Sequence, residues 1–537
     1  MIQKLLVANR GEIALRVFRA ARELGIATVA VVAPDDKGSL HARSADETVE
    51  IASYFFSEEN IRAAKQTGAE AIHPGYGFLA ENPDFAEAVN AAGLTWVGPP
   101  PEALRAGGDK LEAKRIAGEA GVPVVSTGEP DEIGFPLLVK ATAGGGGRGM
   151  RVVREPSELD EALEAARREA KAAFGDDRVF CERYVERPRH VEIQLLADTH
   201  GDVLALGERD CSIQRRHQKV LEESPSPAVD EALRKAMSGA AVAFARAIGY
   251  ESAGTAEFML DGRDFWFLEL NGRIQVEHPV TELVTGVDLV QAQLRVAAGD
   301  PLDVRPDPRG HALEVRLYAE DPRTFFPQTG RIARLRLPEG IRVDAGVAEG
   351  DEVGLAYDPM IAKLIAHGTT RDEAFDRLRA ALKETEVTGV TTNLPFLRWL
   401  VAHPVVRAGD TTTAFLTEHP PLSPAPARVA AAPWRTPFRL NLPSSASTPP
   451  PDVDILAADH RGPAGAQSSV TAPMPGTVIR LLVRTGDSVR ARQPLVVLEA
   501  MKMETPLTSP YDAVVSAVHV AEGDRVAGGT VLVELEE

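Results

Sequence analysis

The first thirty residues alternate between short apolar runs and one amphipathic stretch. Residues 4–8 are an apolar run that predicts a strand, and residues 26–32 are a second, β-branched run. Between them, residues 11–24 carry apolar side chains at helical spacing, and Gly25 is a helix stop. This strand–helix–strand order predicts a parallel, doubly wound sheet. A single glycine, Gly11, marks the first turn where a dinucleotide site would show GxGxxG, so such a site has weak support.

The pattern changes three times further along the chain. A second α/β region continues to about residue 310, and a mixed α and β region follows over 311–418. Residues 421–468 then hold 10 prolines in 48 positions, which predicts a linker without a packed core over 419–468. The alternative is a small irregular domain in which aromatic residues such as Trp434 pack locally.

The C-terminal residues contain an internal repeat. Gly486-Asp487-Ser488-Val489 recurs, 37 residues later, as Gly523-Asp524-Arg525-Val526. Two like halves of short alternating strands predict a small two-fold β-sandwich over 469–537. Lys502 falls between the halves, so we expect it at the turn that joins them.

Charge and cysteine content exclude several classes of protein. The formal net charge of −19 argues against a nucleic-acid binder, which needs a basic surface. Two cysteines, Cys181 and Cys211, cannot build a disulfide framework, so a reducing cytoplasm is expected. Residues 1–7 lack the regions of a signal peptide, and no apolar run reaches the ~18 residues that span a bilayer. We therefore expect a cytoplasmic protein with neither a nucleic-acid nor a membrane partner.

Methionines flank the expected turn lysine in the run Ala500-Met501-Lys502-Met503. Turn lysines are usually only solvated, but two apolar neighbours at an exposed tip are unusual. With Ala472-Pro473-Met474-Pro475-Gly476 upstream, this run resembles the biotinyl (biotin carboxyl carrier) domain. A lipoyl domain has a similar fold but usually carries an acidic residue before its lysine, where this chain has Met501. The resemblance implies that a biotin protein ligase attaches biotin to Lys502.

A glycine run lies between two apolar strands of the second region: Gly144, Gly145, Gly146 and Gly147. Glycines let backbone N–H groups approach phosphate oxygens closely. The run lacks GxxxxGK[ST] and is followed by a strand, so it is not a Walker A loop. We expect a flap over nucleotide phosphates, with Lys110 and Lys140 as phosphate-binding cations. The alternative is a floppy hairpin.

Residues 255–260 and 265–270 predict two strands joined by a tight turn. Such a hairpin would bring Glu257 and Glu269 close together. Beyond it, polar side chains continue at alternate positions, which places Asn271, Arg273, Gln275 and Glu277 on the same face of an extended strand.

This mixture of side chains has a chemical interpretation. Two carboxylates and an amide are hard oxygen ligands for Mg²⁺. An arginine and a further glutamate are able to bind and deprotonate a small anion. A solvated amphipathic strand would show the same alternation.

Five segments together resemble the ATP-grasp biotin carboxylases, and the match covers nearly all of residues 1–418. The segments are residues 8–14, 73–82, the glycine run, 209–219 and 271–282. The resemblance implies a Rossmann-like pre-ATP-grasp domain over 1–112, an ATP-grasp domain with a glycine-rich lid over 113–310, and a biotin carboxylase C-terminal α+β domain over 311–418. The whole fold is then α/β plus β, completed by the linker and the carrier β-sandwich.

The resemblance also implies a role for each matching residue. The Mg²⁺ (or Mn²⁺) ligands are Glu257, Glu269 and Asn271. The ATP contacts are Lys110, Lys140, Gly144, Gly145, Gly146, Gly147, Glu182, Tyr184, Val185, His190, His217, Glu257 and Glu269. Bicarbonate is held by Arg273, Gln275 and Val276. The catalytic set is Glu277 as general base, Arg273, Lys219 for phosphoryl transfer, and Arg316 facing the ureido oxygen of biotin.

The implied function is carboxylation of biotin on the chain's own carrier domain, with ATP as a substrate. A carboxyltransferase needs a domain of its own, and only about 50 linker residues remain, so a separate carboxyltransferase (β) subunit is expected. A coil of that length spans ~35–40 Å and suits a tether. The acceptor implied is acetyl-CoA or propionyl-CoA.

The resemblance further implies a homodimer through the carboxylase domain. Arg19 and Glu23 are suited to cross-chain ion pairs, although they are also spaced for an intrahelical pair. Two rival functions are a different ATP-grasp ligase, such as a carbamoyl-phosphate-type enzyme, and a biotinylated scaffold with no activity. The carrier domain argues against the first, and the intact set of charged site residues argues against the second.

We predict that Lys502 carries biotin. Mass spectrometry of the chain produced with biotin ligase should show one biotin adduct, located on the peptide that contains Lys502. Lys502→Arg should abolish the adduct because arginine cannot form the amide. An unmodified Lys502, or lipoate in its place, would contradict the assignment.

Overall fold

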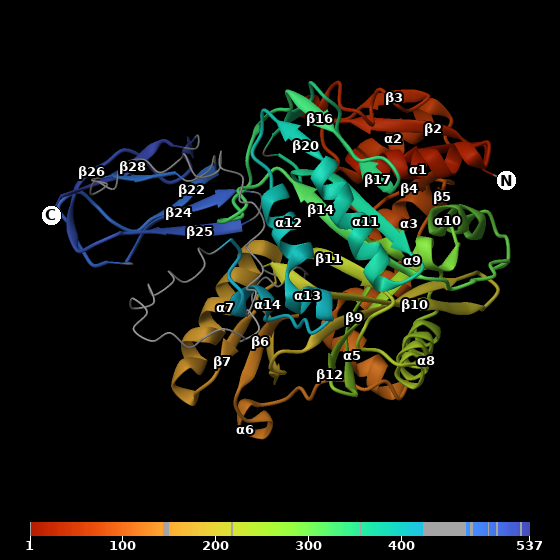
Figure 1. Ribbon diagram of the computed structural model, residues 1–537, viewed down its shortest axis with the longest axis horizontal. Helices are drawn as coiled ribbons and strands as arrows, with labels where there is room; N and C mark the ends of the chain where they lie inside the picture. Colours follow the sequence, from red (N-terminus) through yellow and green to blue (C-terminus); the bar gives the residue numbers. More distant parts are fainter. Residues whose placement is uncertain are drawn as a thin grey trace, which may run out of the picture.

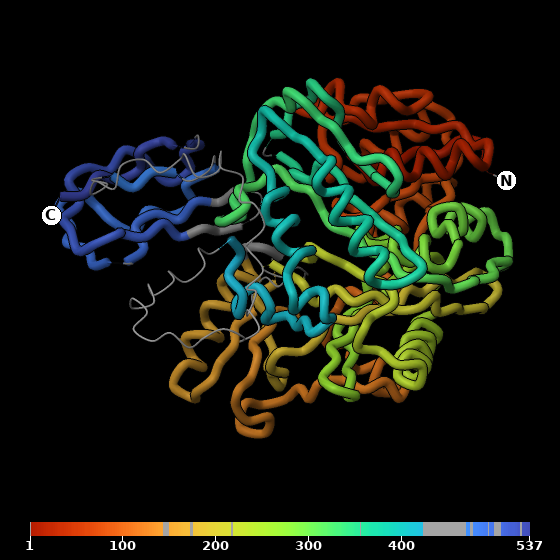
Figure 2. Tube along the Cα trace, in the orientation of Figure 1, coloured from red at the N-terminus to blue at the C-terminus, as the bar shows by residue number. Residues whose placement is uncertain are grey.

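The computed structural model describes residues 2–142, 150–174, 176–215, 218–354, 356–422, 469–472, 476–491, 493–500, 503–526 and 529–536 (Figures 1 and 2). The expected glycine flap at 144–147, His217, the linker residues 423–468 and Lys502 lie outside these described residues. Within the described part of the chain, no helix is both long and apolar enough to cross a membrane.

The N-terminal part of the chain is a parallel five-stranded sheet, as the strand–helix–strand pattern predicts. Its order is β3-β2-β1-β4-β5, and each pairing is parallel. The strands are β1 Lys4–Val7, β2 Ala27–Val32, β3 Glu47–Glu50, β4 Ala71–His73 and β5 Thr95–Trp96. The helices are α1 Gly11–Glu23, η1 Pro34–Asp36, α2 Ser57–Thr67, α3 Pro83–Ala91 and α4 Pro101–Gly108. Gly11 opens α1 with a φ of 64°, a conformation that favours glycine.

A small antiparallel sheet of order β7-β6-β8 borders the expected flap. Its strands are β6 Leu137–Ala141, β7 Arg151–Val153 and β8 Val179–Arg183. The helices of this part are α5 Lys110–Glu119, α6 Pro130–Ile133, η2 Pro156–Glu158 and α7 Leu159–Phe174. The glycine run therefore connects the end of β6 to the start of β7, between two strands as predicted.

The centre of the molecule is an antiparallel eight-stranded sheet of order β13-β12-β9-β10-β11-β14-β19-β17. The strands are β9 Arg189–Ala197, β10 Val203–Arg215, β11 Gln218–Ser224, β12 Ser252–Asp261, β13 Asp264–Asn271, β14 His311–Tyr318, β17 Arg342–Ala345 and β19 Met360–Gly368. β11 pairs with β14, so the sheet continues across the predicted boundary at residue 310. The regions before and after that residue share one hydrogen-bonded sheet.

Helices and two short ladders complete this body. The helices are α8 Glu231–Ala247, α9 His278–Thr285, α10 Leu289–Ala297, α11 Arg371–Glu384, α12 Leu394–Ala402, α13 Pro404–Ala408 and α14 Phe415–Glu418. The ladders pair β15 Gly330–Arg331 with β18 Glu352–Val353, and β16 Arg334–Arg336 with β20 Glu386–Thr388. α9 packs on β14, β11 and β19, and it covers the middle of the central sheet.

The C-terminal residues form two four-stranded sheets, of order β21-β28-β26-β23 and β25-β24-β22-β27, which lie apart from the main body in Figure 1. The strands are β21 Ser469–Thr471, β22 Gly476–Leu481, β23 Ser488–Val489, β24 Pro494–Ala500, β25 Met503–Thr508, β26 Ala513–Val518, β27 Arg525–Val526 and β28 Val531–Glu536. β22, β23 and β24 each begin 37 residues before β26, β27 and β28. The predicted two-fold sandwich is confirmed, and residues 501–502 join β24 to β25.

Candidate active site

Glu257 on β12 and Glu269 on β13 lie directly opposite each other, as the hairpin pattern predicts. Burial raises the pKa of Glu269, and the charge of Glu257 raises it further against the attraction of Lys110. A divalent cation would remove this repulsion, and carboxylate oxygens are ligands that Mg²⁺ prefers. The pair therefore fits a metal ion. Asn271 Nδ2 donates to Glu257 Oε1 at 2.8 Å. The Asn271 amide would therefore have to rotate before its Oδ1 could bind a metal ion.

Lys219 on β11 is the cation at the centre of the site. Its Nζ donates to Glu277 Oε1 at 2.5 Å, to Glu257 Oε1 at 2.8 Å and to Glu192. Burial alone would lower the pKa of Lys219, but these carboxylates outweigh burial and hold that pKa well above its ordinary value. Lys219 is therefore charged and binds Glu257 of the expected metal pair and the expected general base, Glu277, at once.

A bulge in β11 allows Lys219 and Glu222 to serve the same site. Ile213 on β10 pairs with Leu221, but the next residue, Gln214, pairs with Lys219. Two residues of β11 thus oppose one of β10, and Val220 is the extra residue. Lys219 and Glu222, three positions apart, would face opposite sides of a regular strand.

Glu277 and Arg316 complete the charged centre. Arg316 on β14 donates from Nη2 to Glu277 Oε2 at 3.0 Å and from Nε to Glu222 Oε1 at 2.7 Å. Burial would raise the pKa of Glu277, but Lys219, Arg316 and Arg209 together hold it well below its usual range. Glu277 is therefore an ionised acceptor while both cations stay in contact with it.

Arg209 on β10 lies fully buried beneath this centre. It donates to Glu192, to Gln275 Oε1 at 2.9 Å and to Thr281 Oγ1 at 2.8 Å. The attraction of Glu192 and Glu277 outweighs the effect of burial and raises the pKa of Arg209. Sequence analysis assigned no role to Arg209 or Glu192.

The prediction that an alternating strand continues beyond Asn271 is wrong. β13 ends at Asn271, and Glu277 is the N-cap residue of α9, which begins at His278 with Pro279. A loop replaces the expected strand, and this loop still brings the polar side chains to the site. In that loop Arg273 Nε donates to Glu81 Oε2 at 2.9 Å.

Two further contacts hold this loop in place. Gln275 Nε2 donates to Glu257 Oε1 at 3.0 Å. The backbone oxygen of Val276 accepts from Lys363 Nζ at 2.9 Å. The three residues expected to hold bicarbonate are therefore anchored beside the carboxylate pair.

The expected nucleotide residues gather around a second buried carboxylate, Glu182 on β8. Glu182 is fully buried and is bound by both Lys114 and Lys140. Burial opposes ionisation, but Lys140 and Lys114 lower the pKa of Glu182. Lys110, at the start of α5, has a pKa lowered by burial. Lys114 is a further cation here that the sequence did not single out.

Tyr184 and Val185 follow β8 and are half-buried, and the Tyr184 N–H donates to Pro136 O at 3.1 Å. His190 on β9 contacts Glu257 Oε2 through Nε2 at 2.9 Å. Burial would lower the pKa of His190, but Glu257 raises it. His190, Glu192 and Gln194 alternate with the apolar Val191, Ile193 and Leu195 on β9, and this alternation is a signal that would have identified Glu192 from sequence.

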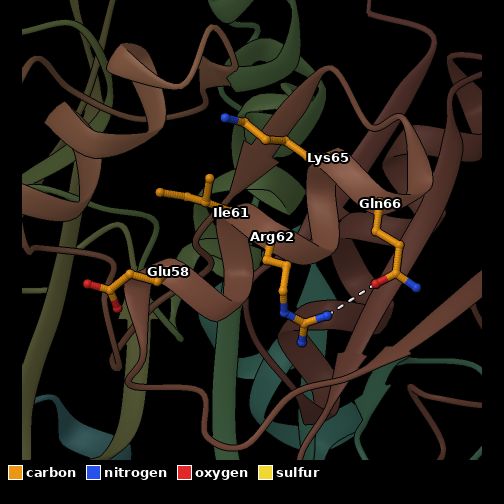
Figure 3. A pocket seen from close by; sticks show the side chains of 5 residues that line it. All are labelled: Glu58, Ile61, Arg62, Lys65 and Gln66. Atoms are coloured by element: carbon orange, nitrogen blue, oxygen red, sulfur yellow. Dashed lines mark hydrogen bonds between the residues drawn. The ribbon is translucent and has the colours of Figure 1, made fainter.

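A separate hollow lies away from these residues, on the exposed side of α2 (Figure 3). It is lined by Glu58, Ile61, Arg62, Lys65 and Gln66, and Arg62 Nη1 donates to Gln66 Oε1 at 3.1 Å. These side chains come from a single helix face and include no buried ionisable group. The hollow therefore lacks the converging charges of the central sheet.

Four family models match the chain. Their descriptions are "Biotin carboxylase, N-terminal domain" over residues 1–104, "Carbamoyl-phosphate synthase L chain, ATP binding domain" over 109–305, "Biotin carboxylase C-terminal domain" over 314–418 and "Biotin-requiring enzyme" over 468–535.

Similar proteins cover both the carboxylase part and the whole chain. The propionyl-CoA carboxylase alpha chain of Ruegeria pomeroyi is 48% identical over 78% of this chain and 68% of its own length. The biotin-dependent acyl-coenzyme A carboxylase alpha3 subunit of Mycobacterium leprae is 41% identical over 100% of this chain and 99% of its own. The biotin carboxylase domain dimer of Hydrogenobacter thermophilus 2-oxoglutarate carboxylase, solved with MgADP, ADP and bicarbonate, is 44% identical, with a TM-score of 0.77 over 78% of this chain and 98% of that chain.

We predict that Arg209→Met destabilises the central sheet by ~3–5 kcal/mol, because the buried carboxylate of Glu192 loses a cation. Urea denaturation of the full chain measures the change. Arg105→Met is the matched control: within the described residues, the ion pairs of Arg105 are exposed ones with Asp84 and Glu87, so its loss should change the unfolding midpoint little. Equal effects of the two substitutions would contradict the role of Arg209.

Proposed function

This chain belongs to the biotin-dependent carboxylases, and from that premise we propose that it uses ATP and bicarbonate to carboxylate a biotin held on its own Lys502. The observation that carries the proposal is the cluster in which Lys219 binds Glu257 and Glu277 while Arg316 also binds Glu277. It joins a metal-binding carboxylate, a base and two cations at one point. A carrier sandwich on the same chain supplies the expected position for biotin.

The nucleotide end of the site is built from cations around Glu182. Lys110 and Lys140 would bind the phosphates of ATP, and the segment from Glu182 through Tyr184 and Val185 would line the adenine. His190 lies beside Glu257 and would meet the phosphates. His217 and the glycine flap are proposed for the same end by resemblance. A Mg²⁺ (or Mn²⁺) ion at Glu257 and Glu269 would neutralise charge on the transferred phosphoryl group.

The bicarbonate end is the anchored loop after β13. Arg273, Gln275 and the backbone of Val276 would hold the anion, and Glu277 would take its proton. Lys219 and Arg316 depress the basicity of Glu277 as long as they remain paired with it. An incoming anion competes for these cations, so Glu277 becomes a stronger base when the anion is in place.

The deprotonated anion would attack the γ-phosphate of ATP and release ADP, with Lys219 stabilising the phosphoryl oxygens. The product, carboxyphosphate, would break down to CO₂ and phosphate. The phosphate would accept the N1 proton of biotin, and N1 would then attack CO₂ to form carboxybiotin. Arg316 would stabilise negative charge on the ureido oxygen. The carboxylated carrier is the product that leaves the site.

The proposed partners are a biotin protein ligase, which would modify the carrier, and a separate carboxyltransferase subunit, which would use the carboxylated biotin. We propose an acyl-CoA, acetyl-CoA or propionyl-CoA, as the acceptor. The names of the Ruegeria and Mycobacterium relatives support an acyl-CoA carboxylase α subunit.

We also propose a homodimer through the carboxylase part, and the dimer of the similar Hydrogenobacter biotin carboxylase domain supports it. Within one chain, Arg19 Nη2 donates to Asp344 Oδ1 at 3.2 Å, and Glu23 Oε2 accepts from Gln291 Nε2 at 2.6 Å. These are the contacts of the two side chains within the described residues, and they take the place of the intrahelical pair. An ion pair of Arg19 or Glu23 with a second chain would therefore have to replace these contacts.

We predict that Glu277→Gln lowers bicarbonate-dependent ATP cleavage by ~10²-fold or more, the usual effect of removing a general base. ATP affinity should stay within a few-fold of wild type, because the nucleotide cations are on other elements. Steady-state kinetics and calorimetric ATP titration measure the two quantities. Glu269→Gln is the matched control and should instead weaken MgATP binding. Near-normal turnover of Glu277→Gln would rule out its role as base.

We predict that the purified chain stops at the carboxylated carrier. With labelled bicarbonate and ATP, label should appear on the chain only when Lys502 is biotinylated. Adding acetyl-CoA or propionyl-CoA alone should leave the label in place, and adding a carboxyltransferase subunit should transfer it. Labelled malonyl-CoA or methylmalonyl-CoA formed without a second polypeptide would overturn this prediction, and bicarbonate-independent ATP cleavage would favour a different ligase.

A further inference from the structure

Glu314, two residues before Arg316 on β14, is a buried carboxyl group that the proposed mechanism does not use. Its side chain is completely buried, and neither carboxylate oxygen has a hydrogen-bond partner among the described residues. A buried carboxylate without a partner would be very costly, so the group must either be neutral or be balanced by a nearby cation.

The neighbouring cations are already occupied. Arg316 binds Glu222 and Glu277. Lys363, opposite Arg316 on β19, has Glu12 Oε2 at 3.1 Å and donates to the backbone of Val276. Neither cation forms an ion pair with Glu314 in the described part of the chain.

A carboxylate lies next to Glu314 instead. Glu222 on β11 is directly opposite Glu314 in the antiparallel register, where cross-strand side chains on one face are within reach of each other. Glu222 Oε1 accepts from Arg316, whereas Glu222 Oε2 is buried and has no partner among the described residues. An unpartnered acceptor on Glu222 therefore faces an unpartnered carboxyl group.

We propose that Glu314 keeps its proton and donates it to Glu222 Oε2, and that this bond positions the carboxylate that orients Arg316. Glu222 and Glu314 are both fully buried and lie opposite each other on paired strands, where two like charges would repel strongly, so the pair retains one proton. Burial raises the pKa of Glu314 well above its ordinary value, and the charges of Glu222 and Glu277 raise it further, against Lys363 and Arg316. Glu314 is thus a positioning residue, which acts on biotin chemistry only through Glu222 and Arg316.

The proposal can be tested by stability without any turnover. Unfolding releases the Glu314 proton at any pH above about 4.5, its unfolded value, so wild-type stability declines as pH rises toward the raised folded pKa. Glu314→Gln keeps a donor and has no proton to lose. The Tm of the full-length Glu314→Gln chain minus the Tm of wild type should therefore increase by ~1–2 °C for each pH unit above pH 5.

Glu223→Gln is the matched control on the neighbouring strand, β11. Glu223 is equally buried, but His311 and Arg371 lower its pKa against the effect of burial. This substitution removes a paired carboxylate and should lower Tm at neutral pH. If Glu314→Gln behaves like Glu223→Gln and lowers Tm at every pH, Glu314 is an ionised partner of a cation and the proposal fails.

A second arm rests on the proposed function and tests the positioning role. Glu314→Leu removes the donor and should lower kcat for biotin-dependent ATP cleavage by roughly tenfold, with KM for MgATP within twofold of wild type, and Glu314→Gln should restore most of that kcat. Equal kcat values for the two variants would overturn the positioning role. If wild type shows no biotin-dependent ATP cleavage, the proposed function fails, while the stability arm still decides whether Glu314 holds its proton.

Discussion

The structure depends on two cations, Lys219 and Arg209, held inside the central sheet. Carboxylates at Glu192, Glu257 and Glu277 would repel one another in a medium of low dielectric constant, and these two cations offset much of that repulsion. The strands that carry these charges are consequently fixed in register. A bulge in β11, a loop after β13 and the capped start of α9 all serve to bring the charges to one point.

The same constraint links the parts of the site to one another. Arg316 shares Glu277 with Lys219, and Glu257 is shared by Lys219, His190 and Asn271. A ligand that pairs with any one of these groups changes the charge seen by the rest. Nucleotide, metal and anion are therefore expected to bind in an interdependent way, since each would take the place of a contact that the protein now makes with itself.

Local patterns in the sequence predicted local structure well. The parallel N-terminal sheet, the hairpin that opposes Glu257 to Glu269, and the 37-residue repeat follow from periodicity and turn residues over short distances. The prediction of a strand beyond Asn271 was wrong because the alternation continued into a loop, where Glu81 holds the Arg273 side chain and Lys363 holds the Val276 backbone. Arg209 and Lys114 were missed because their importance comes from partners 15 to 72 residues away, and pairing at that range leaves no periodic trace. Glu192 was missed although its alternation with His190 and Gln194 was visible in the sequence.

β14 belongs to the carboxyl-terminal region of the carboxylase but pairs with β11 of the preceding region, and it carries Arg316 into a site whose other members come from that region. Separating the two regions would leave β11 and β14 as open strand edges. The two regions are therefore expected to evolve as one unit, because recombination between their coding sequences would yield two incomplete sheets. Both sheets of the carrier sandwich are built from strands of the carrier alone, so exchange, transfer to another gene or loss of the carrier would leave the central sheet intact.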